Sequence, residues 1–391
     1  MSPTLLIFTL ALLAMVGPLG IDTYLPSFPA IAHEFSAAPA LVQQTLSLYV
    51  LAMAAMMLVY GTLSDSFGRR PVILVSLGLF AAANLGAVFA PSVGALMVWR
   101  ILQGLACGAG TVVGRAVLQD YFKGADAARA AATITMVFGL APALAPVLGG
   151  WLQAGLGWRW IFVFLTAFSL GLWLLCYRLL PETLPHARRT AFAPHVVAAN
   201  YARCLRHSSF MLMSLAIAFL FSVIAIYVGS AAAVVMGILH QPETAFAWLF
   251  VPMISGMVGG SAIASRWAHR VAATRMVGVG FTTMTVAALL NVGYNAMFTP
   301  QLPYAVVPIF LYTFGMALAM PSLSVRTLRW FPDMSGMAAS MQGFIQMFVF
   351  ALVSGLVAPL LFGSGLHLAL GLAAGVGLGM LLWRWATRSS T

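Results

Sequence analysis

The sequence predicts an all-α integral membrane protein with twelve transmembrane helices in two six-helix bundles. Three observations support this prediction: a composition too apolar for a water-soluble surface, twelve apolar runs of spanning length, and basic residues concentrated in alternate loops. Hydrophobic residues make up 62% of the 391 residues, whereas Asp, Glu, Lys and Arg together make up only 7%. A soluble globular protein carries about 25% charged residues, so most of this surface must face lipid.

The predicted spans are apolar runs of about 20 residues, the length that a helix needs to cross a bilayer core. The first six lie near residues 4–25, 40–60, 71–90, 94–117, 131–154 and 159–180. The second six lie near residues 209–233, 245–265, 275–296, 303–324, 336–361 and 365–385. This pattern predicts an N-terminal bundle over 1–180, a cytoplasmic linker over 181–208 and a C-terminal bundle over 209–391. Because the first run lacks the basic start of a signal peptide, we expect an uncleaved first helix.

The basic residues predict the orientation, since Lys and Arg in short loops favour the cytoplasmic side. With the N-terminus inside, the inner loops and the C-terminal tail hold sixteen of the nineteen basic residues. The outer loops hold only Arg159, and Arg100 and Arg115 lie within the fourth span. We therefore expect both termini in the cytoplasm.

Composition and spacing also argue against several other classes. The net charge is +11, but the basic residues are scattered between apolar runs, so nucleic-acid binding is not expected. Three cysteines, Cys107, Cys176 and Cys204, match neither a metal site nor a disulfide framework, and the linker histidines are irregularly spaced. We expect no bound metal. In the linker, residues 195–206 are expected to form a short basic helix on the inner leaflet.

The turn between spans two and three carries the most specific motif of the chain. Residues 61–72 read GTLSDSFGRRPV, in which Gly61, Asp65, Gly68, Arg69 and Arg70 follow the pattern G-x-x-x-D-x-x-G-R-R. This pattern resembles the signature motif of the major facilitator superfamily. Two six-helix halves joined by a basic linker are similar to the architecture of that superfamily, so the resemblance covers the whole chain. It implies transport by alternating access, with spans one, four, seven and ten lining the cavity.

Three further stretches narrow the resemblance. In span four, Arg100, Gln103 and Gly104 resemble the R-x-x-Q-G motif of the drug-exporting branches. In span one, DTYLPSFP (residues 22–29) resembles the bicyclomycin- and chloramphenicol-resistance (Bcr/CflA) type exporters. Span five is similar to the antiporter motif, although Ala145 replaces its usual glycine; the matching residues are Gly139, Pro142, Pro146, Gly149 and Gly150.

This resemblance implies a monomeric exporter in the bacterial inner membrane. Its partners would be protons, the lipid bilayer and small, mostly lipophilic drugs or toxic compounds. The proton gradient would drive it, so no cofactor is expected.

The ionisable residues within spans are the candidate coupling groups, because charge at membrane depth is costly. With a rise of 1.5 Å per residue, Asp22 lies about 27 Å along span one and Arg100 about 9 Å into span four. Both then lie in the outer third of the membrane. Because the resemblance implies that spans one and four adjoin, we expect these two residues to pair. Our hypothesis makes Asp22 the protonation site and Arg100 the residue that tunes it. In the alternative interpretation, Asp22 caps the outer end of span one and faces water.

A second group of charges is expected at the cytoplasmic end of the N-terminal bundle. Arg115 and Asp120 lie level with Asp65 and Arg69, and the resemblance implies a charge relay that includes Asp120. The alternative is that these side chains snorkel to the interface. We expect the glycines of the motif to form a tight turn. The loop after span eight has no acid at the place of Asp65. The remaining acids are expected to be solvated in loops: Glu34, Asp126, Glu182, Glu243 and Asp333.

Polar and aromatic side chains within spans are the candidates for the substrate cavity. They are Tyr24, Tyr49, Gln103, Tyr227, Tyr312, Gln342 and Gln346. The 22 Met and 26 Phe residues suit an adaptable apolar pocket, but they are also ordinary lipid-facing residues. Gln342 and Gln346, one turn apart, serve equally well as hydrogen-bonding contacts between helices.

Three other functions remain as alternatives. The same fold suits an exporter of one endogenous metabolite, such as a nucleoside or a sugar. A membrane enzyme needs a catalytic cluster, and the sequence has neither H-E-x-x-H nor paired carboxylates within spans. An ATP-driven pump needs a P-loop, and no G-x-x-x-x-G-K-[ST] is present. An enzyme is therefore not expected.

Overall fold

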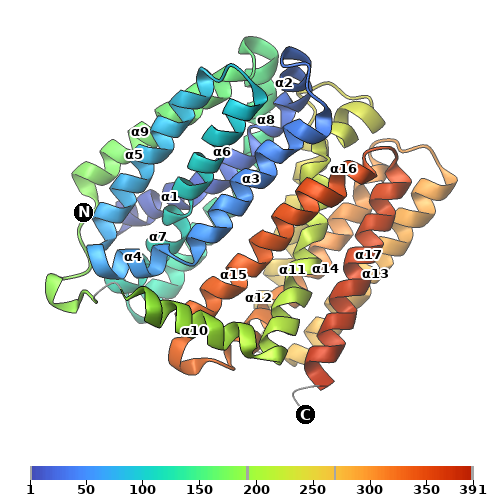
Figure 1. Cartoon of the computed structure of the whole chain (residues 1–391). Helices are drawn as coiled ribbons and strands as arrows, with labels where there is room; N and C mark the ends of the chain where they lie inside the picture. Colours follow the sequence, from blue (N-terminus) through green and yellow to red (C-terminus); the bar gives the residue numbers. More distant parts are fainter. Residues whose placement is uncertain (1, 191–192, 268–269, 389–391) are drawn as a thin grey trace. The chain divides into compact units, whose positions relative to one another are not determined.

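The chain forms two compact units, residues Met1–Ala199 (unit 1) and Asn200–Thr391 (unit 2). The computed structural model describes residues 2–190, 193–267 and 270–388, and all regular elements in these residues are helical (Figure 1). The boundary between the units lies inside the segment 181–208. Each unit has its own core, so the two are described separately.

The helices of unit 1 are α1 (Pro3–Asp22), η1 (Leu25–Ser27), α2 (Phe28–Glu34), α3 (Pro39–Met57), α4 (Tyr60–Phe67), α5 (Arg69–Val88), α6 (Val93–Cys107), α7 (Ala109–Tyr121), α8 (Gly124–Leu156), α9 (Arg159–Leu179) and η2 (His186–Arg188). Helix α10 (Pro194–Arg206) crosses the boundary between the units. The helices of unit 2 are α11 (Ser208–Gly229), the π-helix η3 (Ala233–Ile238), α12 (Ala247–Trp267), α13 (Ala273–Met297), η4 (Tyr304–Val306), α14 (Val307–Leu328), η5 (Pro332–Met334), α15 (Ser335–Leu352), the π-helix η6 (Val353–Val357), α16 (Ala358–Leu361) and α17 (Gly365–Arg388).

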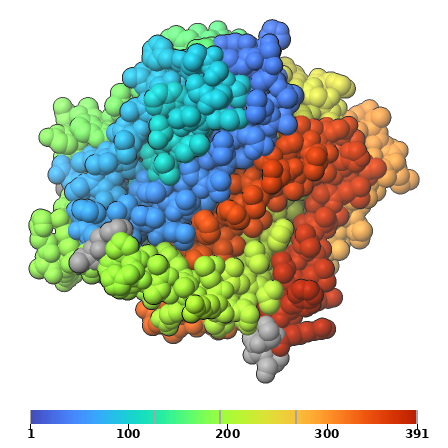
Figure 2. Space-filling view, in the orientation of Figure 1, coloured from blue at the N-terminus to red at the C-terminus, as the bar shows by residue number. Residues whose placement is uncertain are grey.

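The predicted all-α fold with twelve spans is confirmed within the described residues. Twelve helical segments there are long and apolar enough to cross a membrane. Six lie in unit 1 and six in unit 2, in the order that the apolar runs indicate. Figure 2 shows side chains closing the spaces between neighbouring helices of each unit on the face in view.

The fourth span is interrupted within its predicted range, and the first continues beyond its predicted end after a break. The first segment, Pro3–Glu34, breaks after Asp22 into the short helices η1 and α2, and Pro26 lies at this break. The fourth segment, Val93–Tyr121, divides into α6 and α7 at Gly108. Near the first break, the Gly20 carbonyl accepts a hydrogen bond from the buried Arg100 described below.

Small residues let helices approach α1 closely in unit 1. A Cβ atom added at Gly110 of α7 would collide with the Leu13 carbonyl, and one at Gly149 of α8 with the Thr23 carbonyl. Side chains at these positions would therefore push the helices apart. Gly149 of the span-five motif thus has a packing role, whereas Gly139 faces open space. Helix α8 continues through Pro142 and Pro146, and Gly150 is buried.

The motif GTLSDSFGRRPV forms less of a turn than expected. Residues 60–67 are the helix α4, and Gly68 is the single non-helical residue before α5 begins at Arg69. Gly68 has φ +101°, a conformation that residues with a Cβ atom rarely adopt. Gly61 lies within α4, and an added Cβ atom would have no neighbour within 4 Å. The expectation that both glycines form the turn is therefore wrong for Gly61.

Candidate functional site

The deepest charge in unit 1 is the guanidinium of Arg100 on α6, which is 0% exposed. Its Nη1 donates to the Gly20 carbonyl (2.9 Å) and to Gln103 Oε1 (2.8 Å), and its Nε donates to the Thr45 carbonyl (3.4 Å). Its Nη2 is buried and has no hydrogen-bond partner among the described residues. The positive charge is therefore held by neutral oxygen atoms.

Two tyrosine rings enclose the same guanidinium. The Arg100 Cζ atom lies 4.6 Å from the ring centroid of Tyr24 and 4.1 Å from that of Tyr49. Hydrogen bonds fix both rings, because Tyr24 Oη lies 2.9 Å from Thr45 Oγ1 and Tyr49 Oη donates to the Gly17 carbonyl (3.2 Å). The arrangement favours a cation through the negative faces of the rings. Tyr24, Tyr49 and Gln103, predicted to line a substrate cavity, thus lie around Arg100.

Asp22 ends α1 and is 5% exposed, so it does not face water as the alternative interpretation requires. The expected ion pair with Arg100 is absent from the ion pairs of the described residues. The reason is geometric, since carbonyl groups, Gln103 and two aromatic rings already surround the guanidinium. Nor is a hydrogen bond to the Asp22 carboxyl group found in the part of the chain that the structure describes. Asp22 is therefore a buried, unpaired acid two residues from Gly20, whose carbonyl binds Arg100.

A second cluster of charges lies where α4, α5 and α7 meet the first part of the linker. Arg69 Nη1 lies 2.5 Å from Asp65 Oδ1, and Arg69 Nε lies 3.2 Å from Asp120 Oδ2. Arg69 Nη1 also donates to Ser64 Oγ (2.7 Å). The Arg69 side chain is 10% exposed, so these bonds are better shielded than an ordinary surface pair. We call Asp65, Arg69 and Asp120 the latch.

Not every residue predicted for the gate belongs to the latch. Arg115 on α7 is exposed and forms none of the ion pairs found among the described residues. Arg70 instead holds the end of α9, because its Nη2 donates to the Tyr177 carbonyl (2.5 Å).

The acid that sequence reasoning missed in this region is Glu182. It was expected to be solvated, but its side chain is 28% exposed and caps α5. Its two carboxylate oxygens accept hydrogen bonds from the backbone N–H groups of Arg69 (3.0 Å) and Arg70 (3.3 Å). A carboxylate at a helix N-terminus is favoured by the free N–H groups and by the helix dipole. The first turn of α5 has neither an N-cap side chain nor an acid of its own, but this absence does not identify Glu182 as the cap.

The linker makes further bonds to the same region. Thr183 Oγ1 donates to Asp120 Oδ2 (3.0 Å), and the Thr190 N–H donates to the Asp65 carbonyl (3.2 Å). Arg189 Nη2 lies 3.7 Å from Glu182 Oε2. The segment 181–190 is thus bound to unit 1 next to the latch.

Two other acids expected to be solvated form ion pairs. Glu34 pairs with Arg159 (2.7 Å) and accepts a hydrogen bond from Trp158 Nε1 (2.7 Å) at the end of unit 1 remote from the latch. Asp333 pairs with Arg203 of α10 (3.1 Å) in unit 2. These side chains are 38–57% exposed, so each pair contributes less than about 1 kcal/mol.

The buried polar side chains of unit 2 are neutral among the described residues. Gln342 Nε2 on α15 donates to Ser324 Oγ on α14 (3.0 Å), which is the contact between helices that we considered for it. Gln346 is half-buried. The Tyr312 hydroxyl donates to the Leu220 carbonyl. Asn291 Nδ2 on α13 donates to Tyr227 Oη on α11 (2.6 Å).

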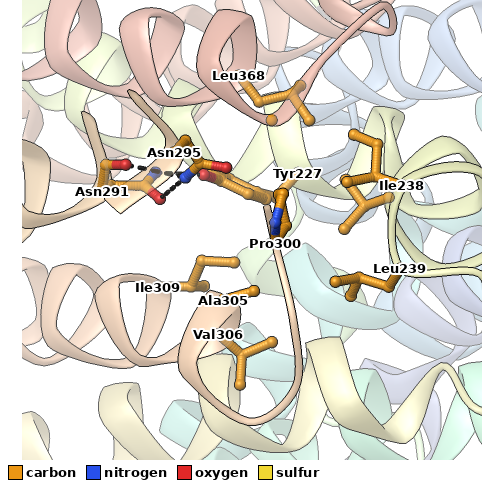
Figure 3. A pocket seen from close by; sticks show the side chains of 12 residues that line it. Tyr227, Ile238, Leu239, Asn291, Asn295, Pro300, Ala305, Val306, Ile309 and Leu368 are labelled. Atoms are coloured by element: carbon orange, nitrogen blue, oxygen red, sulfur yellow. Dashed lines mark hydrogen bonds between the residues drawn. The ribbon is translucent and has the colours of Figure 1, made fainter. Parts of the chain in front are cut away.

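Tyr227, Asn291 and Asn295 lie together at one side of a cavity of about 30 Å³ (Figure 3). Sequence reasoning found Tyr227 but missed the two asparagines. Asn291 and Asn295 are four residues apart within an apolar span, so both lie on one helix face. This spacing would have marked them as candidate cavity residues.

Comparisons with known proteins agree with this architecture. A family model described as "Major Facilitator Superfamily" matches residues 10–290. A protein of Haemophilus influenzae named "Bicyclomycin resistance protein homolog" is 29% identical over 379 residues, which are 93% of each chain. "Multidrug resistance protein D" of Escherichia coli is 27% identical over 342 residues, covering 87% of this chain and 85% of that protein.

Solved structures of low sequence identity show the same fold. The crystal structure of the human organic anion transporter MFSD10 (TETRAN) has a TM-score of 0.71 at 18% identity and covers 99% of this chain and 100% of that one. A bacterial homologue of the human lysosomal transporter Spinster, in an inward-facing and occupied conformation, has a TM-score of 0.75 at 16% identity and covers 100% of this chain and 97% of that one.

Proposed function

Because the chain belongs to the Major Facilitator Superfamily, we propose that this transporter is a proton-coupled antiporter that exports small, mostly lipophilic drugs or toxic compounds. Two relatives that span more than four fifths of the chain carry names of drug-resistance proteins, which supports this substrate class. In this proposal the protein resides in the inner membrane of a bacterium, with both termini in the cytoplasm, as the distribution of its basic residues indicates.

The observation that carries the coupling proposal is the unpaired, buried carboxyl group of Asp22, two residues along the chain from the Gly20 carbonyl that binds Arg100. A carboxyl group that alternates between a sealed environment and water binds a proton in one and releases it in the other. Arg100 has its own oxygen and aromatic contacts, so it stays charged while Asp22 changes state. In this mechanism Arg100 supplies a constant field, and Asp22 carries the proton.

The experiment compares Asp22→Asn with Asp126→Asn, since Asp126 is an exposed acid in the first turn of α8. Drug export is measured in inverted membrane vesicles with and without an imposed proton gradient. We expect Asp22→Asn to move substrate down the substrate's own gradient and to gain nothing from the proton gradient. Asp126→Asn should behave like the wild type.

Two results would contradict the proposal. Full proton-driven export by Asp22→Asn would remove Asp22 from the mechanism. Unchanged susceptibility of cells expressing the wild-type chain, across several drug classes, would favour the export of one endogenous metabolite instead.

A further inference from the structure

The cavity of unit 2 lies at the end of this unit that is remote from the linker. Tyr227 is about 29 Å along α11 from its start at Ser208, at 1.5 Å per residue. Tyr227, Asn291 and Asn295 form the polar side of the cavity (Figure 3). The rest of the lining is mainly aliphatic and includes Ile238, Ile309 and Leu368. This polar and apolar pairing is typical of small-molecule sites.

The polar side retains hydrogen-bonding capacity. Asn291 Nδ2 donates one hydrogen bond to Tyr227 Oη, and Asn295 Nδ2 donates to the side-chain oxygen (3.0 Å) and the backbone oxygen (2.8 Å) of Asn291. Within the described residues, this leaves the Tyr227 hydroxyl proton, one Asn291 amide proton and Asn295 Oδ1 without partners. Tyr227 is 6% exposed and Asn291 is 1% exposed, so these unused donors are costly unless something pairs with them.

The position of the Asn295 amide depends on a glycine. A Cβ atom added at Gly365, at the start of α17, would collide with Asn295 Oδ1 and would lie 3.1 Å from Pro300 Cγ. The missing side chain therefore makes room for the amide at the edge of the cavity. The wall that holds Ile238 is the π-helix η3, a form of helix that is rare in proteins and frequent at functional sites.

The chemistry of the cavity favours a neutral group. The two acids in the sequence of unit 2 are Glu243 and Asp333, and neither lines the cavity. A cation entering it would lose its hydration without gaining an opposite charge. An amide or a hydroxyl group can satisfy both the free donors and the free acceptor, whereas a carbonyl group can pair only with the donors. The volume of about 30 Å³ suits one such group rather than a whole drug molecule.

We infer that this cavity is a specificity subsite that binds a neutral hydrogen-bonding group of the exported compound through Tyr227, Asn291 and Asn295. The inference rests on the proposed export function. In this inference, unit 2 recognises uncharged polar groups of the substrate. One such group enters the cavity, and the rest of the compound remains outside it.

The test uses two probes in proteoliposomes that contain the purified full chain. Chloramphenicol is neutral and carries an amide and two hydroxyl groups, whereas tetraphenylphosphonium is a cation without a hydrogen-bonding group. Tyr227→Phe removes only the hydroxyl group, and Asn291→Leu removes the amide at similar volume. Leu289→Ala on the same helix is the matched control, because Leu289 is 68% exposed and lies away from the cavity.

We expect each cavity variant to raise the KM for chloramphenicol about five- to tenfold, the effect of one lost hydrogen bond, with little change in kcat. The KM for tetraphenylphosphonium should stay the same. Gly365→Ala should produce the same selective loss, because it displaces the Asn295 amide without removing a polar group. Leu289→Ala should leave both probes unaffected.

Other results would overturn the inference. Equal losses for both probes, together with a lower melting temperature, would show that the cluster only holds α11 and α13 together. Unchanged transport of both probes by all three cavity variants would also exclude the subsite, as would a wild-type protein that carries tetraphenylphosphonium but not chloramphenicol. A wild-type protein that carries neither probe would instead contradict the proposed function itself.

Discussion

The two units have similar helical frameworks but differ in the chemistry of their buried polar groups. Unit 1 holds a buried acid, Asp22, a buried cation, Arg100, and the latch around Arg69. The buried polar side chains of unit 2 are amides, hydroxyl groups and phenols. They form hydrogen bonds such as that between Gln342 and Ser324. Charged groups respond to protons and to electric fields, whereas neutral amides select ligands by hydrogen bonding. In the functions proposed above, unit 1 couples transport to protons and unit 2 selects the substrate, and this difference supports that division.

The largest loss of stability and transport is expected from Arg100→Leu in unit 1. The matched substitution in unit 2 is Gln342→Leu. Arg100→Leu removes the charge and leaves the Gly20 and Thr45 carbonyls and Gln103 without their donor, at a cost of about 1–3 kcal/mol for each buried group left unpaired. Transport should be lost. Gln342→Leu should cost about 0.6 kcal/mol, the average for a polar contact between membrane helices.

The stability of both variants is measured as the melting temperature in detergent, and their activity is measured as transport in vesicles. If Gln342→Leu abolished proton-driven export while Arg100→Leu preserved it, the assignment of roles to the two units would be reversed.

The next effect concerns the backbone at the latch. Gly68→Ala places a Cβ atom 2.5 Å from Glu182 Oε2, in a backbone conformation with φ +101° and ψ 155° that essentially only glycine adopts. We expect a loss of about 1–3 kcal/mol in the free energy of unfolding and impaired transport. Gly61→Ala is the matched control, because Gly61 is helical and has open space. It should be neutral or stabilise by up to about 1 kcal/mol. Equal effects of the two substitutions on melting temperature would contradict this account of the motif.

The smallest effects are expected from the two contacts that hold the linker, that of Glu182 with α5 and that of Arg203 with Asp333. Glu182→Gln removes a charged cap from two N–H groups of α5, and we expect a loss of about 1 kcal/mol. Asp333→Asn breaks the pair with Arg203, in which both side chains are more than half exposed, and should cost less than about 0.5 kcal/mol. Thermal unfolding at low and high salt separates the two cases, since only the exposed pair is strongly screened. A larger loss for Asp333→Asn would show that the second half of the linker is the stronger anchor.

The sequence was sufficient to predict the helical framework, because the length and composition of an apolar run determine whether it can span a bilayer. The order of the helices followed from the apolar runs, and the proximity of Asp65, Arg69 and Asp120 followed from their matching depth and from the resemblance. Contacts between residues far apart in the sequence were harder to predict. Glu182 lies 113 residues from Arg69, and nothing local distinguishes it from a solvated linker acid.

The environment of Arg100 shows a second limit of sequence reasoning. Depth along two helices placed Asp22 and Arg100 at the same level, but depth does not fix the rotation of a helix about its axis. The guanidinium turned toward carbonyl groups at the end of α1 and toward two tyrosine rings, partners that charge counting ignores. The neutral cluster of Tyr227, Asn291 and Asn295 was overlooked for a related reason, because attention to charges passes over amides.

The bond between Glu182 and α5 also has a consequence for biosynthesis. Residues of the linker leave the ribosome only after the sixth span has been made, so the N-terminus of α5 has no cap while the first six spans enter the membrane. Unit 1 therefore completes its folding late, when residues 181–190 reach the latch. A nascent chain that ends at residue 180 contains all six spans of unit 1. It lacks the Glu182 carboxylate that caps α5 and the Thr183 hydroxyl group that binds Asp120.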